Sequence, residues 1–201
     1  DSAVITLADF MLSEAVTVPG VLGPKTESKR FAEYWTSRTG RFCRPKMSER
    51  IYACESVEPL KYAPGRLRLA TNDDHALLSE WCIQFCLDAR IEDEINYFKA
   101  RLPSKITDGS LFVWENNEAV AMAGIERESA HGVAISCVFT PSPLRRRGYA
   151  TSCVAALTQR MLDSGKKFCC LYTDLANPTS NSIYQKIGYR PVCDVQDWIF
   201  E

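Results

Sequence analysis

The chain has 201 residues, of which 46% are hydrophobic and 24% charged, and its formal net charge at pH 7 is -1. This is ordinary globular composition for one large domain, or one domain plus a fragment. Near-neutrality provides no global positive field for nucleic acid. No apolar run reaches the ~20 residues of a membrane-spanning helix, so neither nucleic acid nor membrane is an expected partner.

The nine cysteines lack the spacing of a zinc site. Cys82 and Cys86 are too far apart for a zinc knuckle, Cys169 and Cys170 are adjacent, and we expect no metal. Most of the cysteines lie in apolar runs, where a free thiol behaves as a small hydrophobe. Together with the lack of a visible signal peptide, this predicts reduced thiols and a cytoplasmic protein.

The first 62 residues give the weakest pattern. Turn residues and apolar spacing predict four elements in the order helix, strand, helix, strand: Ala8–Ala15, Val16–Leu22, Glu27–Arg38 and Glu49–Val57. Residues 25–50 hold eight basic and three acidic side chains. This excess indicates a nucleic-acid patch, a solvated basic face or a rim that helps to hold phosphate groups, and we prefer the last two interpretations to the first.

From Gly65 the periodicity is clearer. It predicts an ordered series of strands and helices: strand Arg66–Ala70, helices His75–Ala89 and Ile91–Leu102, strands Leu111–Trp114, Ala119–Ile125 and Val133–Thr140, helix Tyr149–Ser164, strand Phe168–Thr173, helix Pro178–Lys186, and a last strand or two between Tyr189 and Phe200.

The stretch Val138–Ala150 reads as the end of a buried strand, a basic turn and the start of a helix. Pro141 and Pro143 end the strand because proline cannot donate a backbone hydrogen bond. The helix start is rich in arginine and carries the small residues Gly148 and Ala150. Unpaired N–H groups and the positive end of the helix dipole make such a turn an anion site.

The spacing Arg145-x-x-Gly148-x-Ala150 resembles the Arg/Gln-x-x-Gly-x-Gly/Ala signature of the GNAT superfamily of N-acetyltransferases. A second stretch, Asn177-Pro-Thr-Ser-Asn-Ser-Ile-Tyr184-Gln-Lys-Ile-Gly188-Tyr189, is similar to a later signature of that superfamily. The resemblance covers roughly residues 66–201. It implies an α/β acyl-CoA N-acyltransferase fold whose mixed sheet is splayed between the fourth and fifth strands of that region.

The resemblance also implies acetyl-CoA as co-substrate. The residues it assigns to the CoA site form the end of the fourth strand, the basic turn and the later signature: Val138, Phe139, Thr140, Arg145, Arg146, Arg147, Gly148, Tyr149, Ala150, Asn177, Asn181 and Tyr184. Asn177 precedes Pro178 and is equally a helix N-cap, so Asn181 is the better candidate for the CoA arm.

Tyr184 matches the general acid that protonates the CoA thiolate in this superfamily, although its place between apolar residues also suits a core tyrosine. The general base is less clear. Many superfamily members carry a glutamate where this chain has Ala134, and Glu126 or Glu128 on the preceding strand could replace it. Either could also be a solvated strand end.

Acidic residues Glu92, Asp93 and Glu94 lie where the superfamily shapes its acceptor site, so Glu92 and Glu94 could attract a cationic amine. An exposed acidic helix start explains them more simply. Some bacterial acetyltransferases of the superfamily carry a degenerate second GNAT-like lobe. By that resemblance, residues 1–62 form a partial lobe and residues 63–201 form the catalytic domain.

The leading hypothesis is acetyl transfer from acetyl-CoA to a primary amine of a small molecule or a peptide, by direct transfer in a ternary complex. The alternatives are an inactive CoA-binding sensor or scaffold, and an acyltransferase that uses a longer acyl-CoA. A tRNA-linked acyl donor is disfavoured by the complete pyrophosphate signature. Neither the acceptor nor the oligomeric state follows from the sequence.

Overall fold

The computed structural model describes residues 2–201, which divide into two compact units. The first unit contains the chain up to Tyr52 together with Tyr172–Asn181 and Pro191–Glu201. The second contains Ala53–Leu171 and Ser182–Arg190. The C-terminal strand therefore lies in the same unit as the N-terminal residues, whereas the sequence suggested a boundary after residue 62. The interpretation of residues 1–62 as a GNAT-like lobe stays a prediction.

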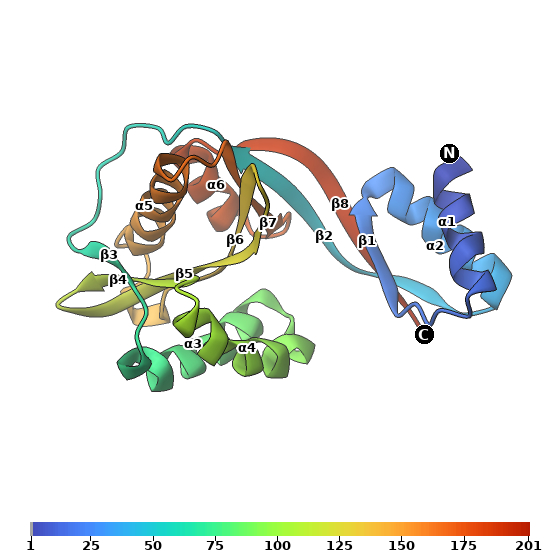
Figure 1. Ribbon diagram of the computed structural model, residues 1–201, viewed down its shortest axis with the longest axis horizontal. Coiled ribbons are helices and arrows are strands. Elements are labelled where there is room, and N and C mark those ends of the chain that lie inside the picture. Colours follow the sequence, from blue (N-terminus) through green and yellow to red (C-terminus); the bar gives the residue numbers. More distant parts are fainter. Residues whose placement is uncertain (1) are drawn as a thin grey trace. The chain divides into compact units, whose positions relative to one another are not determined.

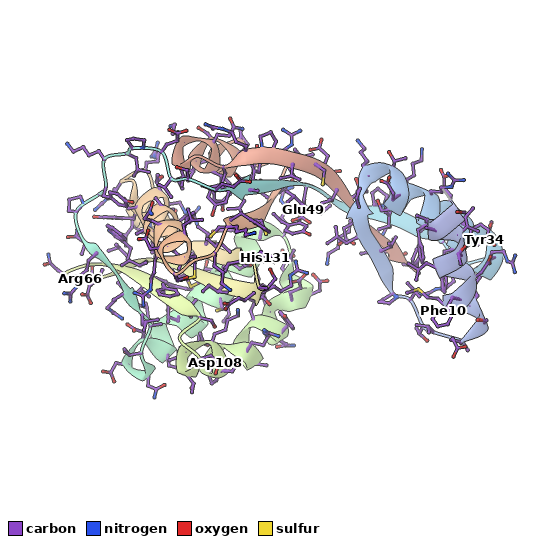
Figure 2. All side chains as sticks on the ribbon, turned by 45° about the horizontal axis from the view of Figure 1, so that its top comes forward. Phe10, Tyr34, Glu49, Arg66, Asp108 and His131 are labelled. Atoms are coloured by element: carbon purple, nitrogen blue, oxygen red, sulfur yellow. The ribbon has the colours of Figure 1, made fainter. Side chains whose placement is uncertain are left out.

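The first unit follows the expected order of helix, strand, helix and strand with shifted bounds: α1 (Ser2–Ser13), β1 (Gly20–Pro24), α2 (Lys25–Thr39) and β2 (Cys43–Cys54). Strand β8 (Arg190–Phe200) lies between β1 and β2, and it pairs antiparallel with β1 from Gly20↔Ile199 to Pro24↔Val195. In Figure 2, Phe10 marks α1 and Tyr34 marks α2. The Tyr34 hydroxyl joins these helices by donating a hydrogen bond to Asp9.

Aromatic rings form the core of the first unit. Phe31 stacks on Trp35 with 5.6 Å between ring centroids, and Phe200 packs 6.3 and 6.1 Å from these two rings. Basic residues of the 25–50 run make internal contacts here. The Arg41 guanidinium donates to the carbonyls of Val18 and Phe200 at 3.0 and 2.6 Å. Two others form ion pairs with the C-terminal strand region, Arg44 with Glu201 and Arg50 with Asp194.

The second unit contains most of the region that resembles the superfamily. Its elements follow the predicted order: β3 (Arg66–Leu69), α3 (His75–Ala89), a 3-10 turn (Glu92–Glu94), α4 (Ile95–Thr107), β4 (Leu111–Asn116), β5 (Glu118–Glu128), β6 (Gly132–Phe139), α5 (Tyr149–Asp163), β7 (Phe168–Asp174) and α6 (Pro178–Ile187). The last residues of β7 and the first turn of α6 belong to the first unit.

Helices cover both faces of the sheet in the second unit, whose strands follow the order β7-β6-β5-β4-β3. Helix α5 lies on one face and α3 with α4 on the other (Figure 1). The core between the sheet and α3 and α4 is apolar and includes three buried thiols: Ala70, Leu78, Trp81, Cys82, Cys86, Phe98, Leu102, Ile106, Leu111, Val113, Met122, Cys137 and Phe139. All nine cysteines are free, and six of them are buried.

The sheet opens between β6 and β7, as predicted for the fourth and fifth strands of this region. All the other strand pairs of this unit are antiparallel, whereas β6 and β7 run parallel. Their pairing runs from Gly132↔Phe168 to Ala134↔Cys170, although β6 continues to Phe139. The predicted mixed, splayed α/β fold is therefore confirmed.

Two features are absent from residues 2–201. No helix in this range combines the length and apolar character needed to cross a bilayer. In the same range, no group of three His, Cys, Asp or Glu side chains is placed to hold a metal ion.

Candidate functional site

Strand β6 changes its register against β5 just before the basic turn. Gly124 pairs with Ser136 and Met122 pairs with Phe139, so three steps along β6 match two along β5. Cys137 lies within the shift and has a φ of 53°, an unusual value for a residue other than glycine. A β-bulge of this kind bends the strand and redirects its backbone groups. It therefore lies directly before Val138, Phe139 and Thr140, the strand end assigned to CoA.

A second register shift occurs on β5 and places Glu126. Ile125 pairs with Ile135 and Arg127 pairs with Ala134, so Glu126 is an extra residue beside Ala134. Ala134 is the position at which many superfamily members carry a glutamate. The bulge thus brings a carboxylate from the neighbouring strand next to the position where this chain lacks one.

The Glu126 carboxylate is held by side chains of α4. Tyr97 donates to Oε1 at 3.0 Å, and Lys105 Nζ lies 2.8 Å from Oε2 and also donates to the Ile125 carbonyl. Burial by itself raises the pKa of Glu126, but the hydrogen bond and charge of Lys105 outweigh it, and the net pKa is lowered. Glu126 is therefore a stable anion and a weak proton acceptor.

The basic turn begins with a 3-10 turn, Ser142–Leu144, and ends at Gly148, the N-cap of α5. Arg146 and Gly148 have φ values of 63° and 82°. No side chain of residues 2–201 caps the first N–H groups of α5, and Arg146, Arg147 and Gly148 are exposed. These unpaired donors, beside exposed guanidinium groups, fit the pyrophosphate of a CoA molecule.

The side chains of Arg145 and of Tyr149, the first residue of α5, contact other elements, whereas Arg147 Nη2 donates to the Pro143 carbonyl within the turn at 3.3 Å. Arg145 Nε donates to the Thr140 carbonyl at 2.9 Å, and its Nη2 pairs with Asp88. Tyr149 is buried, and its hydroxyl accepts a hydrogen bond from Asn116 at 3.1 Å. Arg145 and Tyr149 therefore help to hold the turn on the fold.

Residues 55–65, which we call the strap, lie against both signature glycines. An ideal Cβ on Gly148 would lie 3.7 Å from the Ala63 Cβ, and one on Gly188 only 2.6 Å from the Ser56 carbonyl oxygen. The Ser152 hydroxyl accepts a hydrogen bond from the Ala63 amide at 2.8 Å. Glycine at position 188 therefore makes room for the strap, whereas at position 148 a Cβ would make only an ordinary contact and glycine instead suits the φ of 82°. Sequence reasoning missed the strap because it lies before the signatures.

Tyr184 is buried in the second unit, with 7% of its surface exposed and its ring edge-on to Tyr189 at 5.9 Å. Burial raises the pKa of Tyr184 to about 12, so the hydroxyl keeps its proton at neutral pH. The buried ring is thus what we expect of a core tyrosine. The protonated hydroxyl is what a general acid needs.

Asn177 and Asn181 lie in the first unit, where both have structural partners. Asn177 Oδ1 accepts from the Ser180 amide at 3.1 Å, which is an N-cap bond to α6. Asn181 Nδ2 donates to the carbonyls of Asp174 and Asn177, and its Oδ1 accepts from the Tyr52 hydroxyl. Their assignment to the CoA arm stays a prediction.

The acidic residues form the short turn Glu92–Glu94 that leads into α4, with Glu92 exposed and Glu94 half-buried. Tyr97 follows one turn later and has a raised pKa, caused by burial, by its bond to Glu126 and by the charges of Glu126 and Glu94. The negative charges of Glu94 and Glu126 thus both raise the pKa of the exposed Tyr97 hydroxyl.

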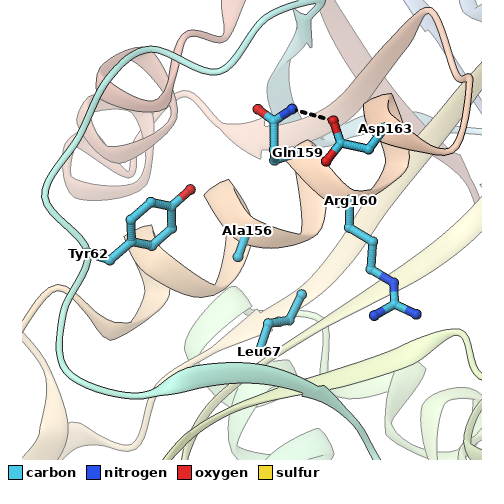
Figure 3. A pocket seen from close by; sticks show the side chains of 6 residues that line it. All are labelled: Tyr62, Leu67, Ala156, Gln159, Arg160 and Asp163. Atoms are coloured by element: carbon cyan, nitrogen blue, oxygen red, sulfur yellow. Dashed lines mark hydrogen bonds between the residues drawn. The ribbon is translucent and has the colours of Figure 1, made fainter.

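An open pocket of about 370 Å³ lies along the outer side of α5 (Figure 3). It is lined by Tyr62, Leu67, Ala156, Gln159, Arg160 and Asp163. Gln159 donates a hydrogen bond to Asp163 one turn further along α5. This lining contains neither the basic turn nor the end of β6, so the pocket is separate from the candidate site.

Comparisons with known proteins agree with this geometry. The sequence model of the family described as "FR47-like protein" matches residues 113–199, which contain both signatures. Among curated proteins, none matches the chain. A GNAT-family acetyltransferase from Colwellia psychrerythraea shares 12% identity with a TM-score of 0.67, over 92% of this chain and 66% of its own.

The chain therefore has the fold of the GNAT-family acetyltransferases, and both signatures lie in the region that the family model matches. A GCN5-related N-acetyltransferase from Sphaerobacter thermophilus has 15% identity and a TM-score of 0.67, over 89% of this chain and 58% of its own. A predicted acetyltransferase from Clostridium acetobutylicum, solved with acetyl-CoA, has 20% identity and a TM-score of 0.52. The likeness covers 63% of this chain and 90% of the Clostridium chain. The chain spans about two thirds or less of the Colwellia and Sphaerobacter proteins, and at these identities the likeness shows the fold alone.

Proposed function

We propose that this protein is an acetyl-CoA-dependent N-acetyltransferase of the GNAT superfamily that acts on a primary amine of a small molecule or a peptide. The observation that carries the proposal is the bulged end of β6, which continues beyond the residues that pair with β7. This strand end leads through the basic turn to the uncapped N-terminus of α5. Such an end offers backbone donors to an acyl thioester and to a pyrophosphate within one continuous segment.

The first N–H groups of α5, with exposed Arg146 and Arg147, would hold the pyrophosphate. The backbone of Val138 and Thr140 would bind the pantetheine arm and polarise the thioester carbonyl. The Thr140 hydroxyl is buried and lacks a hydrogen-bond partner among residues 2–201, which leaves it free to bond a polar group of the ligand.

In the transfer step, the amine nitrogen forms a bond to the thioester carbon, and the carbon–sulfur bond breaks. Tyr184 donates its proton to the departing thiolate and regains one from water, a role that suits a hydroxyl kept protonated by burial. Glu126 acts as an anion that orients the amine or a water, and the water removes the proton from the attacking nitrogen. Its lowered pKa favours this indirect role over direct proton uptake.

The acidic turn supports a cationic acceptor. Glu92 is exposed at the start of α4, and Glu94 acts on Tyr97, which also bonds Glu126. A carboxylate group near the acceptor site raises the local concentration of an ammonium ion before it loses its proton.

The test is a thiol-release assay with acetyl-CoA against polyamines, aminoglycosides, amino acids and peptides. Thiol release that depends on both acetyl-CoA and one class of amine would support the proposal. CoA binding by calorimetry without turnover of any amine would favour the sensor, for which Ala134 at the usual glutamate position is the specific observation. Faster turnover with a longer acyl-CoA than with acetyl-CoA would favour an acyltransferase that uses the longer acyl donor.

A further inference from the structure

Arg145, the first arginine of the basic turn, is held against the protein by three contacts. Its Nε donates to the Thr140 carbonyl at 2.9 Å, its Nη2 pairs with Asp88, and its guanidinium carbon lies 5.8 Å from the centre of the Phe139 ring. A guanidinium presents its donors in a fixed plane, so these contacts define its orientation. The resemblance assigns this arginine to the pyrophosphate, whereas its Nε and Nη2 donors are directed at the protein.

Helix α3 reaches the end of β6 through two neighbouring contacts. Asp88, in the last turn of α3, pairs with Arg145. Trp81, two turns earlier, packs on Phe139 with 5.9 Å between ring centroids. Trp81 thus holds the ring of Phe139, and Asp88 acts through Arg145 on the carbonyl of Thr140. Both groups lie at the end of β6, directly before the basic turn.

We propose that Asp88 and Arg145 are positioning residues, which hold the backbone of Thr140 and the basic turn in the conformation that binds acetyl-CoA. Arg145 then acts through the protein and not as a phosphate ligand. The side chains of Arg145 and Asp88 are 44% and 46% exposed, so their ion pair adds little to overall stability. Its effect is local. The inference rests on the proposed function, because it concerns the binding of that same co-substrate.

The substitution Asp88→Asn separates the two roles, because they predict opposite changes. Positioning predicts weaker CoA binding, by about two- to fivefold, since the pair that orients Arg145 is lost. A phosphate-ligand role predicts tighter binding, since Arg145 is released from a competing carboxylate and a negative charge near an anion site is removed. The measurement is the dissociation constant of CoA by calorimetry, with the melting temperature as a check of folding.

Three further variants complete the test. Glu80→Gln makes the same charge change at an exposed position of the same helix and should leave CoA affinity unchanged. Arg145→Lys keeps the charge but cannot reproduce the planar fork, so positioning predicts a loss close to that of Arg145→Gln. Tighter or unchanged binding in Asp88→Asn, or full affinity in Arg145→Lys, would overturn the inference alone. Absence of CoA binding by the unsubstituted protein would overturn the proposed function as well.

Discussion

Tyr184 combines a core position with a reactive group, and the two aspects respond differently to substitution. Tyr184→Phe keeps the ring packed against Tyr189 and removes only the hydroxyl. If the hydroxyl protonates the thiolate, kcat and kcat/KM should fall together by ~10²-fold, with acetyl-CoA affinity almost unchanged. Steady-state kinetics and calorimetry measure these quantities. Full activity in the phenylalanine variant would leave Tyr184 as a core residue only.

Glu126 and Lys105 form a mostly buried ion pair, with 19% and 7% of their side chains exposed. Glu126→Gln leaves the Lys105 charge without its counterion, and we expect it to lower the free energy of unfolding by about 3 kcal/mol. Glu128→Gln on the same strand is the control. Glu128 is 57% exposed in its pair with Lys166, so that variant should lose less than about 1 kcal/mol in urea denaturation.

The pH dependence gives a second readout for Glu126. Its pKa in the folded protein is lower than the usual 4.5, so its stabilising effect is complete above that value and is lost as the pH falls through the folded pKa. The unsubstituted protein should therefore lose stability on acidification more steeply than Glu126→Gln. Parallel pH profiles for the two proteins would show that the ion pair contributes nothing.

At the scale of elements, α5 has a glycine with positive φ at each end, 82° at Gly148 and 97° at Gly165. Alanine at either position costs about 1–2 kcal/mol of backbone strain. Only the first end carries the proposed phosphate site, so Gly148→Ala should also weaken CoA binding, by about tenfold. Urea denaturation and calorimetry of the two variants provide the comparison. Equal CoA affinities would place the pyrophosphate elsewhere.

The helices and strands of the second unit were predictable from the sequence because apolar residues recur in each with helical or strand spacing. Turn residues such as glycine and proline also mark where these elements end. The β6 bulge was not, since Cys137 gives no sign of its positive φ. The position of Glu126 depends on a second register shift, and only the pairing with Ala134 reveals it. The pair between Asp88 and Arg145 joins residues 57 positions apart, a separation that no local pattern encodes.

At the scale of the whole molecule, the first unit is built from both ends of the chain. Its core contains Phe31 and Trp35 from α2, and Phe200 from the last strand. The Arg41 guanidinium also bonds the Phe200 carbonyl. The division into a lobe of residues 1–62 and a catalytic domain of residues 63–201 follows the order of the chain, and it stays a prediction.

Phe200→Ala tests whether the last strand belongs to this core. Phe200 is 3% exposed and contacts two aromatic rings, so its truncation should lower the free energy of unfolding by about 3 kcal/mol or more. Phe42→Ala is the matched control, because Phe42 exchanges backbone hydrogen bonds with Glu201 but is 64% exposed, and its loss should stay within about 0.5 kcal/mol. Urea denaturation of both variants measures the difference. Equal, small losses would mean that the N-terminal elements are stable without the last strand, as a self-contained lobe of residues 1–62 requires.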